Sequence, residues 1–193
     1  KGSADIKNAA FANNVAVSGG AVGGSSSSTG VLSVSGGTFT NNHARDDGGA
    51  IAAFKSLMIT DSLFENNTAM YLPDENGAYT VKQSTDNNPI GGGALALGAV
   101  SESEIASISG TTFKNNRSGY NGGAIGTRLA QNTDDDANFN SNSAKLDIAA
   151  TFIENFAENN GGAIYNTFYN DNGAGKGDGV TVTGIFTGNK AGN

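Results

Sequence analysis

The sequence predicts an all-β protein whose fold is a parallel β-helix of about six coils with inserted loops. Three observations predict this fold. Two short motifs, F-x-x-N and Gly-Gly-Ala-aliphatic, alternate along nearly the whole chain of 193 residues. Aliphatic residues recur at every second position ahead of the F-x-x-N motifs, which is the period of a strand with one buried face. The interval between copies suits one coil of a solenoid.

The two motifs keep a fixed order and spacing. The first Gly follows the Phe by nine residues in three copies and by eight in the first copy. The in-register F-x-x-N copies begin at Phe11, Phe39, Phe64, Phe113, Phe152 and Phe186, and the Gly-Gly-Ala copies begin at Gly19, Gly48, Gly92, Gly122 and Gly161. Each unit is therefore predicted to contain a strand, a Phe, an Asn turn and a second strand.

An aliphatic or Ala pair sets the register of the strand before each Phe. The pair stands seven and five positions before the Phe at Ala4 and Ile6, Leu32 and Val34, Leu57 and Ile59, and Ala106 and Ile108. It stands one residue closer at Leu146 and Ile148, and at Val180 and Val182. The shortest interval between the Phe residues of successive F-x-x-N motifs, 25 residues, is enough for three short strands and three turns. We expect successive coils to pair in parallel, about 4.8 Å apart.

Gly and Asn are predicted to form the turns of these coils. They number 29 and 25, more than a quarter of the chain, but they stand at fixed offsets from aliphatic residues, which indicates turns rather than disorder. Asn tolerates the left-handed backbone region, and its amide can bond to the Asn of the next coil. We expect both properties in a ladder of Asn14, Asn42, Asn67, Asn116, Asn155 and Asn189. The paired glycines are expected to supply positive φ and close approach at the second corner.

Longer intervals between motifs predict insertions at particular turns. Residues 70–90 enlarge the turn between Asn and Gly-Gly, and residues 128–144 and 166–179 enlarge the turn after the Gly-Gly-Ala strand. We expect these polar segments to project from the shaft. Phe139 begins one further F-x-x-N sequence that lacks the aliphatic pair, so it belongs to a projecting loop or to a degenerate extra coil.

Composition excludes several classes of function. The net charge is −7 and the basic residues do not cluster, so nucleic acid is not an expected partner. The absence of Cys excludes disulfides and thiolate metal sites. No apolar run approaches the roughly 20 residues that span a bilayer, so we expect no membrane-spanning segment in this chain.

Four groups of residues resemble sites of chemistry, and each has a simpler interpretation. His43, Asp46 and Asp47 share one turn, but sugar hydrolysis needs carboxylates on facing positions, so we expect solvated side chains. Asp134 to Asp136 lack the spaced ligands of a calcium loop, and the glycine-rich segment 173–178 lacks phosphate-loop spacing. Glycosylation acceptor patterns at Asn66 and Asn116 arise from the repeat itself. The sequence predicts no catalytic, cofactor-binding or metal-binding residue and no cofactor.

The repeated motifs resemble those of the polymorphic outer-membrane protein family, chlamydial-type autotransporters with passenger domains that carry repeated GGA[ILV] and FxxN. The resemblance covers nearly the whole chain, with five copies of the first motif and six of the second. It implies a right-handed β-helix displayed at a cell surface, with adhesion as its activity. Cys, which is common in chlamydial members, is absent here.

The leading hypothesis is a non-enzymatic structural or adhesive β-helix, secreted or exposed at the outer cell surface. Residues 1–193 are expected to form a single β-helix domain, either part of a longer β-helix or a subunit that stacks end to end into filaments. A host-surface protein or a glycan would be its other partner. The alternatives are a polysaccharide lyase or hydrolase, and a glycan-binding module with platforms at Tyr71, Tyr79, Tyr165 and Tyr169.

Overall fold

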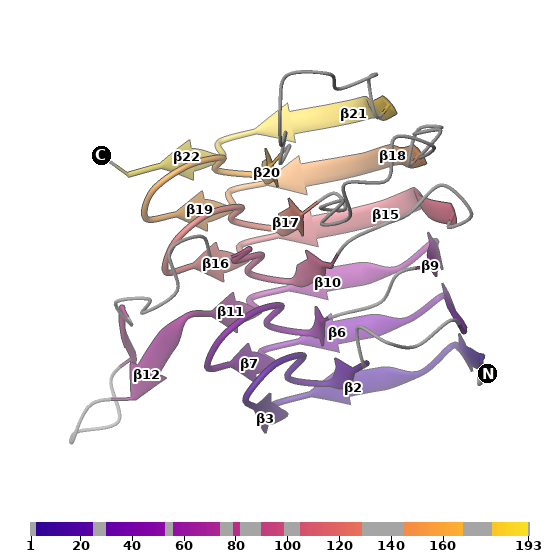
Figure 1. Cartoon of the computed structure of the whole chain (residues 1–193), viewed down its shortest axis with the longest axis horizontal. Coiled ribbons are helices and arrows are strands. Elements are labelled where there is room, and N and C mark those ends of the chain that lie inside the picture. The colour runs from indigo at the N-terminus through magenta and orange to yellow at the C-terminus, as the bar shows by residue number, and fades with distance from the viewer. Residues whose placement is uncertain are drawn as a thin grey trace, which may run out of the picture.

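The computed structural model describes residues 3–24, 30–52, 56–73, 79–81, 90–98, 105–128, 145–167 and 179–192. Within these ranges the chain forms strands without helices, arranged as stacked coils around a narrow core (Figure 1). Each coil contributes strands to three parallel sheets, here named A, B and C. The fold is a parallel β-helix, as the repeat predicts.

Sheet A carries the longest strands. Two strands form this side in the first three coils, namely β1 (Ala4–Lys7) and β2 (Ala10–Ala12), β5 (Val31–Ser35) and β6 (Thr38–Thr40), and β9 (Ser56–Thr60) and β10 (Leu63–Glu65). One continuous strand forms it in the next three, namely β15 (Ile105–Lys114), β18 (Lys145–Ile153) and β21 (Gly179–Thr187). Each strand therefore pairs with its counterpart one coil away.

Sheets B and C close the coil. Sheet B contains two-residue strands, β3 (Val15–Ala16), β7 (His43–Ala44), β11 (Thr68–Ala69), β16 (Arg117–Ser118), β19 (Phe156–Ala157) and β22 (Lys190–Ala191). Sheet C contains the Gly-Gly-Ala strands, β4 (Val22–Gly23), β8 (Ile51–Ala52), β14 (Leu95–Leu97), β17 (Ile125–Arg128) and β20 (Ile164–Thr167). Six coils result, and the sixth is described only over sheets A and B.

The core consists of columns of like side chains. The Phe rings of the F-x-x-N motifs stack nearly parallel, with centroids 4.6 to 5.2 Å apart from one coil to the next. The aliphatic pairs and the last residue of each Gly-Gly-Ala motif pack against this stack, as Leu57, Ile59 and Leu95 do in the third coil. The predicted interior columns are confirmed. Stability in such a core is a sum over neighbouring coils.

A β-bulge explains why the aliphatic pair lies one residue closer to the Phe in the last two coils. Strands β15 and β18 pair in register until Ser109, and the next paired residue of β15 is Thr111. Gly110, with φ of 58°, is the extra residue. An inserted residue is accommodated as a bulge without changing the face to which the flanking residues point, so both halves of the strand keep their buried columns.

The predicted asparagine ladder is present. Its six residues are joined by side-chain amides that donate to the amide oxygen of the next coil at 2.8 to 3.0 Å. The same amides of the later five residues also donate to the carbonyl of the Phe one coil earlier. Asn42, Asn67 and Asn116 are fully buried. A buried amide satisfied on every side contributes stability, whereas a lost partner leaves a costly orphan.

The left-handed turn, however, does not belong to the ladder residues, and that part of the prediction is wrong. Positive φ falls on the preceding residue of each motif, at Asn13, Asn41, Asn66, Asn115, Glu154 and Gly188. The reason is geometric, because the left-handed residue turns the chain while the residue after it must point inward to join the ladder. Asn is therefore frequent at two successive positions for two separate reasons.

The two glycines of each Gly-Gly-Ala motif also have separate structural roles. Gly122 has φ of 63°, which glycine adopts without strain. A Cβ on Gly123 would lie only 2.0 Å from the carbonyl oxygen of Gly162 in the next coil. The prediction that the pair supplies positive φ and close approach is confirmed, with one role for each glycine.

The insertion at residues 70–90 leaves the stack beside sheet B (Figure 1). It contains β12 (Tyr71–Pro73) and β13 (Tyr79–Val81), which pair as an antiparallel hairpin that the sequence did not predict. Most of the other two insertions, 128–144 and 166–179, lies outside the described residues, as does Phe139. Their described residues belong to strands, because Arg128 ends β17, Asn166 and Thr167 end β20, and Gly179 begins β21.

Deletion of residues 72–90 is expected to leave the β-helix intact. Met70 and Gly119 occupy equivalent positions, because Ala69 pairs with Ser118. Joining Tyr71 to Gly91 would restore the spacing of the fourth coil, and shortening a loop changes closure entropy only slightly. Circular dichroism should keep its β signal and a cooperative melt. Loss of that signal would show that the hairpin is needed to form the shaft.

Candidate binding surface

The outer face of sheet B presents a column of varied side chains. The second residue of each two-residue strand is small, and at Ala44, Ala69, Ser118 and Ala157 it is buried. The first residue points to the opposite side because side chains alternate along a strand. This outward column consists of Val15, His43, Thr68, Arg117, Phe156 and Lys190. Fixed interior positions thus carry an outer surface that differs at each coil.

Arg117 is the centre of an ordered cluster on this face. Its Nε donates to the Tyr71 hydroxyl at 2.7 Å, and its Nη2 donates to the Glu158 carboxylate at 3.0 Å. The Tyr71 hydroxyl donates to the same carboxylate at 2.7 Å. The guanidinium carbon also lies 4.6 Å from the ring centroid of Phe156 and 5.2 Å from that of Tyr71. Three successive coils are therefore joined by one guanidinium.

Tyr71 is a fixed part of this cluster rather than an exposed platform. Its side chain is buried. Burial, and then the hydrogen bond to Glu158, raise the pKa of its hydroxyl far above the ordinary value. The hydroxyl therefore stays protonated and keeps its donor role. The prediction of an exposed glycan platform at Tyr71 is wrong, because the residue begins the inserted hairpin and is covered by its surroundings.

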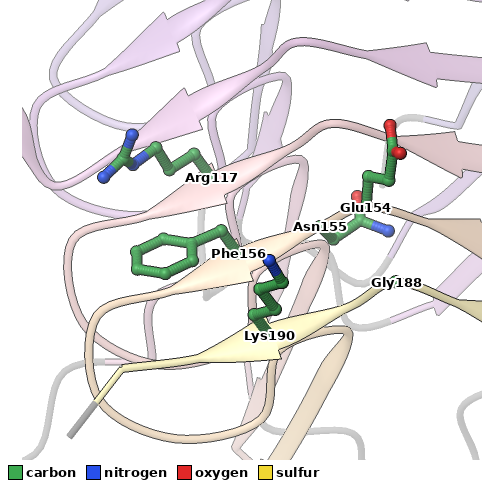
Figure 2. Close-up of a pocket in the computed structure, with 6 residues that line it drawn as sticks. All are labelled: Arg117, Glu154, Asn155, Phe156, Gly188 and Lys190. Carbon is green, nitrogen blue, oxygen red and sulfur yellow. The ribbon is translucent and has the colours of Figure 1, made fainter.

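A shallow depression of about 500 Å³ lies beside the cluster (Figure 2). It is lined by Arg117, Glu154, Asn155, Phe156, Gly188 and Lys190. Phe156 and Lys190 come from sheet B, whereas Glu154 and Gly188 form the left-handed corner between sheets A and B. Its volume is within the range of roughly 300 to 1,000 Å³ that small-molecule sites occupy.

The turn that contains His43, Asp46 and Asp47 is structured, and the expectation of solvated side chains is wrong for His43. Its ring is buried, with Nδ1 2.7 Å from the Thr68 hydroxyl. Asp46 pairs with Arg45 at 3.1 Å, and the Gly91 backbone N–H donates to Asp47 at 2.9 Å. These three residues do not converge on one point, since each has its own structural partner.

His43 should make stability depend on pH. Burial lowers its pKa below the ordinary value of 6.5, so the unfolded chain takes up a proton at a higher pH than the folded protein. Its contribution is complete above pH 6.5 and is lost as pH falls toward the folded pKa. We expect denaturant melts between pH 7 and pH 5 to lose more stability in the wild type than in His43→Gln. Parallel curves for the two proteins would contradict this assignment.

The remaining sequence candidates fall in different places. Asp134 to Asp136, the segment 173–178 and Tyr169 lie outside the described residues. Asn116 is fully buried in the ladder, and Asn66 is exposed at its left-handed turn. Tyr165 is half-buried in β20. No group of three or more His, Cys, Asp or Glu residues within the described ranges could hold a metal ion.

Comparison with known proteins places the repeat in a family. The Chlamydia polymorphic membrane protein repeat matches residues 36–53, 110–128 and 149–167. The chain therefore carries three copies of this repeat. No curated protein and no solved structure matches the chain. The described part contains no helix that is both long and apolar enough to cross a membrane.

The matched polymorphic membrane protein repeats coincide with structural coils. Each matched segment begins three residues before a motif Phe and includes the sheet B strand and the start of the sheet C strand, in coils two, four and five. Coils one and three carry the same motifs and pair in the same register. The repeat indicates a surface protein of the autotransporter type, and the family is one of non-enzymatic surface proteins.

Two features of this surface were not predicted from the sequence. Asn121 and Asn160 form a second, shorter ladder, in which the Asn160 amide and backbone N–H both donate to the Asn121 amide oxygen. Both residues directly precede a Gly-Gly pair, which is the signal that could have revealed them. The Arg117 cluster has no such signal, because its members come from positions where the repeat varies.

Proposed function

We propose that this chain is a non-enzymatic, adhesive β-helix displayed at the outer cell surface or secreted, and that it forms a single domain over residues 1–193. One observation supports the proposal above all others. The residues that define the repeat lie in the core and the asparagine ladder. The residue type in the outward column of sheet B, in contrast, differs at every coil. A regular shaft with a variable exposed face suits recognition of a partner surface.

Binding to cells would test adhesion. Beads coated with the folded protein should attach to epithelial cells in greater number than beads coated with the heat-denatured protein. The expected reason is that the outward column exists as a surface only when the coils are stacked. Equal attachment of the two kinds of bead would contradict an adhesive role.

The second candidate, a polysaccharide lyase or hydrolase, is less well supported. Such an enzyme needs acidic groups held at facing positions. Three of the described carboxylates, Asp46, Asp47 and Glu158, are each engaged in a hydrogen bond or ion pair on the outer surface. Incubation with pectic and alginate-like glycans should yield no cleavage, with or without calcium. Cleavage abolished by Asp46→Asn or Asp47→Asn would favour the enzyme.

A second copy of this chain, or an adjoining part of a longer chain, is proposed to cover the sixth coil. Strand β21 leaves Ile185 62% and Phe186 48% exposed, although Phe186 continues the buried Phe column. A strand paired with β21 would cover the inward Phe186 ring and would reduce the exposure of Ile185 on the outer face. Sedimentation should show association that Phe186→Asp reduces. If the protein is monomeric at all concentrations, a second copy does not cover the sixth coil, and an adjoining part of a longer chain is the remaining proposal.

A further inference from the structure

The depression beside Arg117 combines an aromatic ring with charged groups on both sides. Figure 2 shows Phe156 on the strand between those that carry Arg117 and Lys190, with Glu154 at the right of the view. The lining residues come from three successive coils, β16, β19 and β22. The hollow therefore exists only when the coils are stacked in register.

The Phe156 ring is held in place from one side. The Arg117 guanidinium lies 4.6 Å from its centroid, and this guanidinium is itself fixed by Tyr71 and Glu158. A cation held over an aromatic face is favourable, and here the cation is also hydrogen-bonded. The ring is half-buried and lines the depression, so it offers a preformed apolar surface. Preformed surfaces lose less conformational entropy on binding.

The charged side chains that line the depression differ in whether they already have an ion-pair partner. Arg117 is paired with Glu158 at 3.0 Å, so its charge is already balanced. Lys190 is exposed, and no described acidic group lies within ion-pair distance of it. Glu154 is exposed and also lines the depression. A ligand that fits must bring an anion to Lys190 and hydrogen-bond donors to Glu154.

We infer that this depression binds a ring of an acidic saccharide of the hexuronate class. The C–H face of a pyranose would pack on Phe156, because aromatic faces carry negative charge that favours such hydrogens. The carboxylate would accept from Lys190, and a ring hydroxyl would donate to Glu154. The inference deepens the proposed adhesive function by naming a chemical class of partner and the site that holds it.

A matched pair of sugars tests the site by NMR titration of the folded protein. The probes are methyl β-D-glucuronide and methyl β-D-glucoside, which differ only in a carboxylate where the other has a hydroxymethyl group. We expect the glucuronide to shift the backbone amides of Arg117, Phe156 and Lys190 at millimolar concentration. The glucoside should bind at least about tenfold more weakly, since a charge-assisted hydrogen bond is lost.

Two variants separate the parts of the site, and a third is the control. Lys190→Gln should remove the preference for glucuronide, and Phe156→Ala should remove binding of both sugars. Lys7→Gln, an exposed Lys on sheet A, should change neither. Each variant is compared with the wild type by its circular dichroism spectrum, and Lys190 lies on an exposed strand where substitution leaves the core untouched.

Two outcomes would overturn the inference. One is that neither sugar shifts amides around the depression, and the other is that Lys190→Gln and Phe156→Ala bind both sugars as the wild type does. If coated beads still attach to cells while glucuronide binding is absent, adhesion stands and the saccharide assignment fails. If glucuronide binds while folded and denatured beads attach equally, the site stands and adhesion fails.

Discussion

Asn116→Ala should be among the most destabilising single substitutions in this protein. Its amide oxygen accepts from both the backbone N–H and the side chain of Asn67, at 3.0 and 2.9 Å. Its Nδ2 donates to the Phe64 carbonyl and to Asn155, at 2.9 and 3.0 Å. Truncation leaves several buried groups without partners at about 1 to 3 kcal/mol each, so the total loss should reach about 3 kcal/mol or more.

Asn159→Ala is the matched control, because Asn159 is exposed. Its substitution should change the free energy of unfolding by less than about 0.5 kcal/mol. Asn116→Asp adds a second comparison, since it keeps the shape of the side chain but loses the Nδ2 donors and brings a buried charge. Thermal melts of the three variants and the wild type measure the difference. Equal melting temperatures for Asn116→Ala and Asn159→Ala would exclude a ladder that contributes stability.

Gly123→Ala should be comparably severe for a steric reason. A Cβ at this position would lie 2.0 Å from the Gly162 carbonyl oxygen and 2.6 Å from the Phe156 backbone nitrogen. Backbone atoms cannot rotate away as a flexible side chain can, so two coils must separate locally. Overpacking costs about 1 to 3 kcal/mol and occasionally more, and a clash with backbone atoms belongs at the upper end of that range. Denaturant unfolding should show a large fall in the transition midpoint.

Gly98→Ala provides the control for this steric effect. Among the described residues, no atom lies within 4 Å of a Cβ added to Gly98, and the φ of Gly98 is not in the left-handed region. The substitution restricts the unfolded chain and should be neutral or stabilising by up to about 1 kcal/mol. Equal denaturant midpoints for Gly123→Ala and Gly98→Ala would show that successive coils do not approach closely at Gly123.

The repeat made most of the fold predictable. A column in a parallel β-helix requires the same residue type at each coil, so Phe113 and Asn116 are visible in the sequence as members of a series. The bulge at Gly110 is visible in the sequence as a one-residue difference in spacing between coils. Only the strand pairing identifies that difference as a bulge. Periodic features are predictable because one physical demand recurs at one position.

The candidate site was not predictable for the opposite reason. Tyr71 and Glu158 are 87 residues apart and meet through Arg117 only because coils three, four and five stack in register. Arg117 and Glu158 each occur once at their position among the coils, so no recurrence marks them. The burial of His43 likewise depends on its contacts with the third coil, where the insertion begins. Outward positions are free to vary, and their contacts require the three-dimensional arrangement.

Hydrogen exchange of asparagine side chains tests the central claim most directly, namely that a buried amide ladder joins the coils. In ¹⁵N NMR spectra recorded after transfer to D₂O, the Nδ2 hydrogens of Asn42, Asn67, Asn116 and Asn155 should persist because these residues are buried and hydrogen-bonded. They should exchange at least about 100-fold more slowly than those of exposed Asn159, which corresponds to local opening costs of about 2.7 kcal/mol. Exchange of all five side chains at one fast rate would contradict the ladder and the stacking that depends on it.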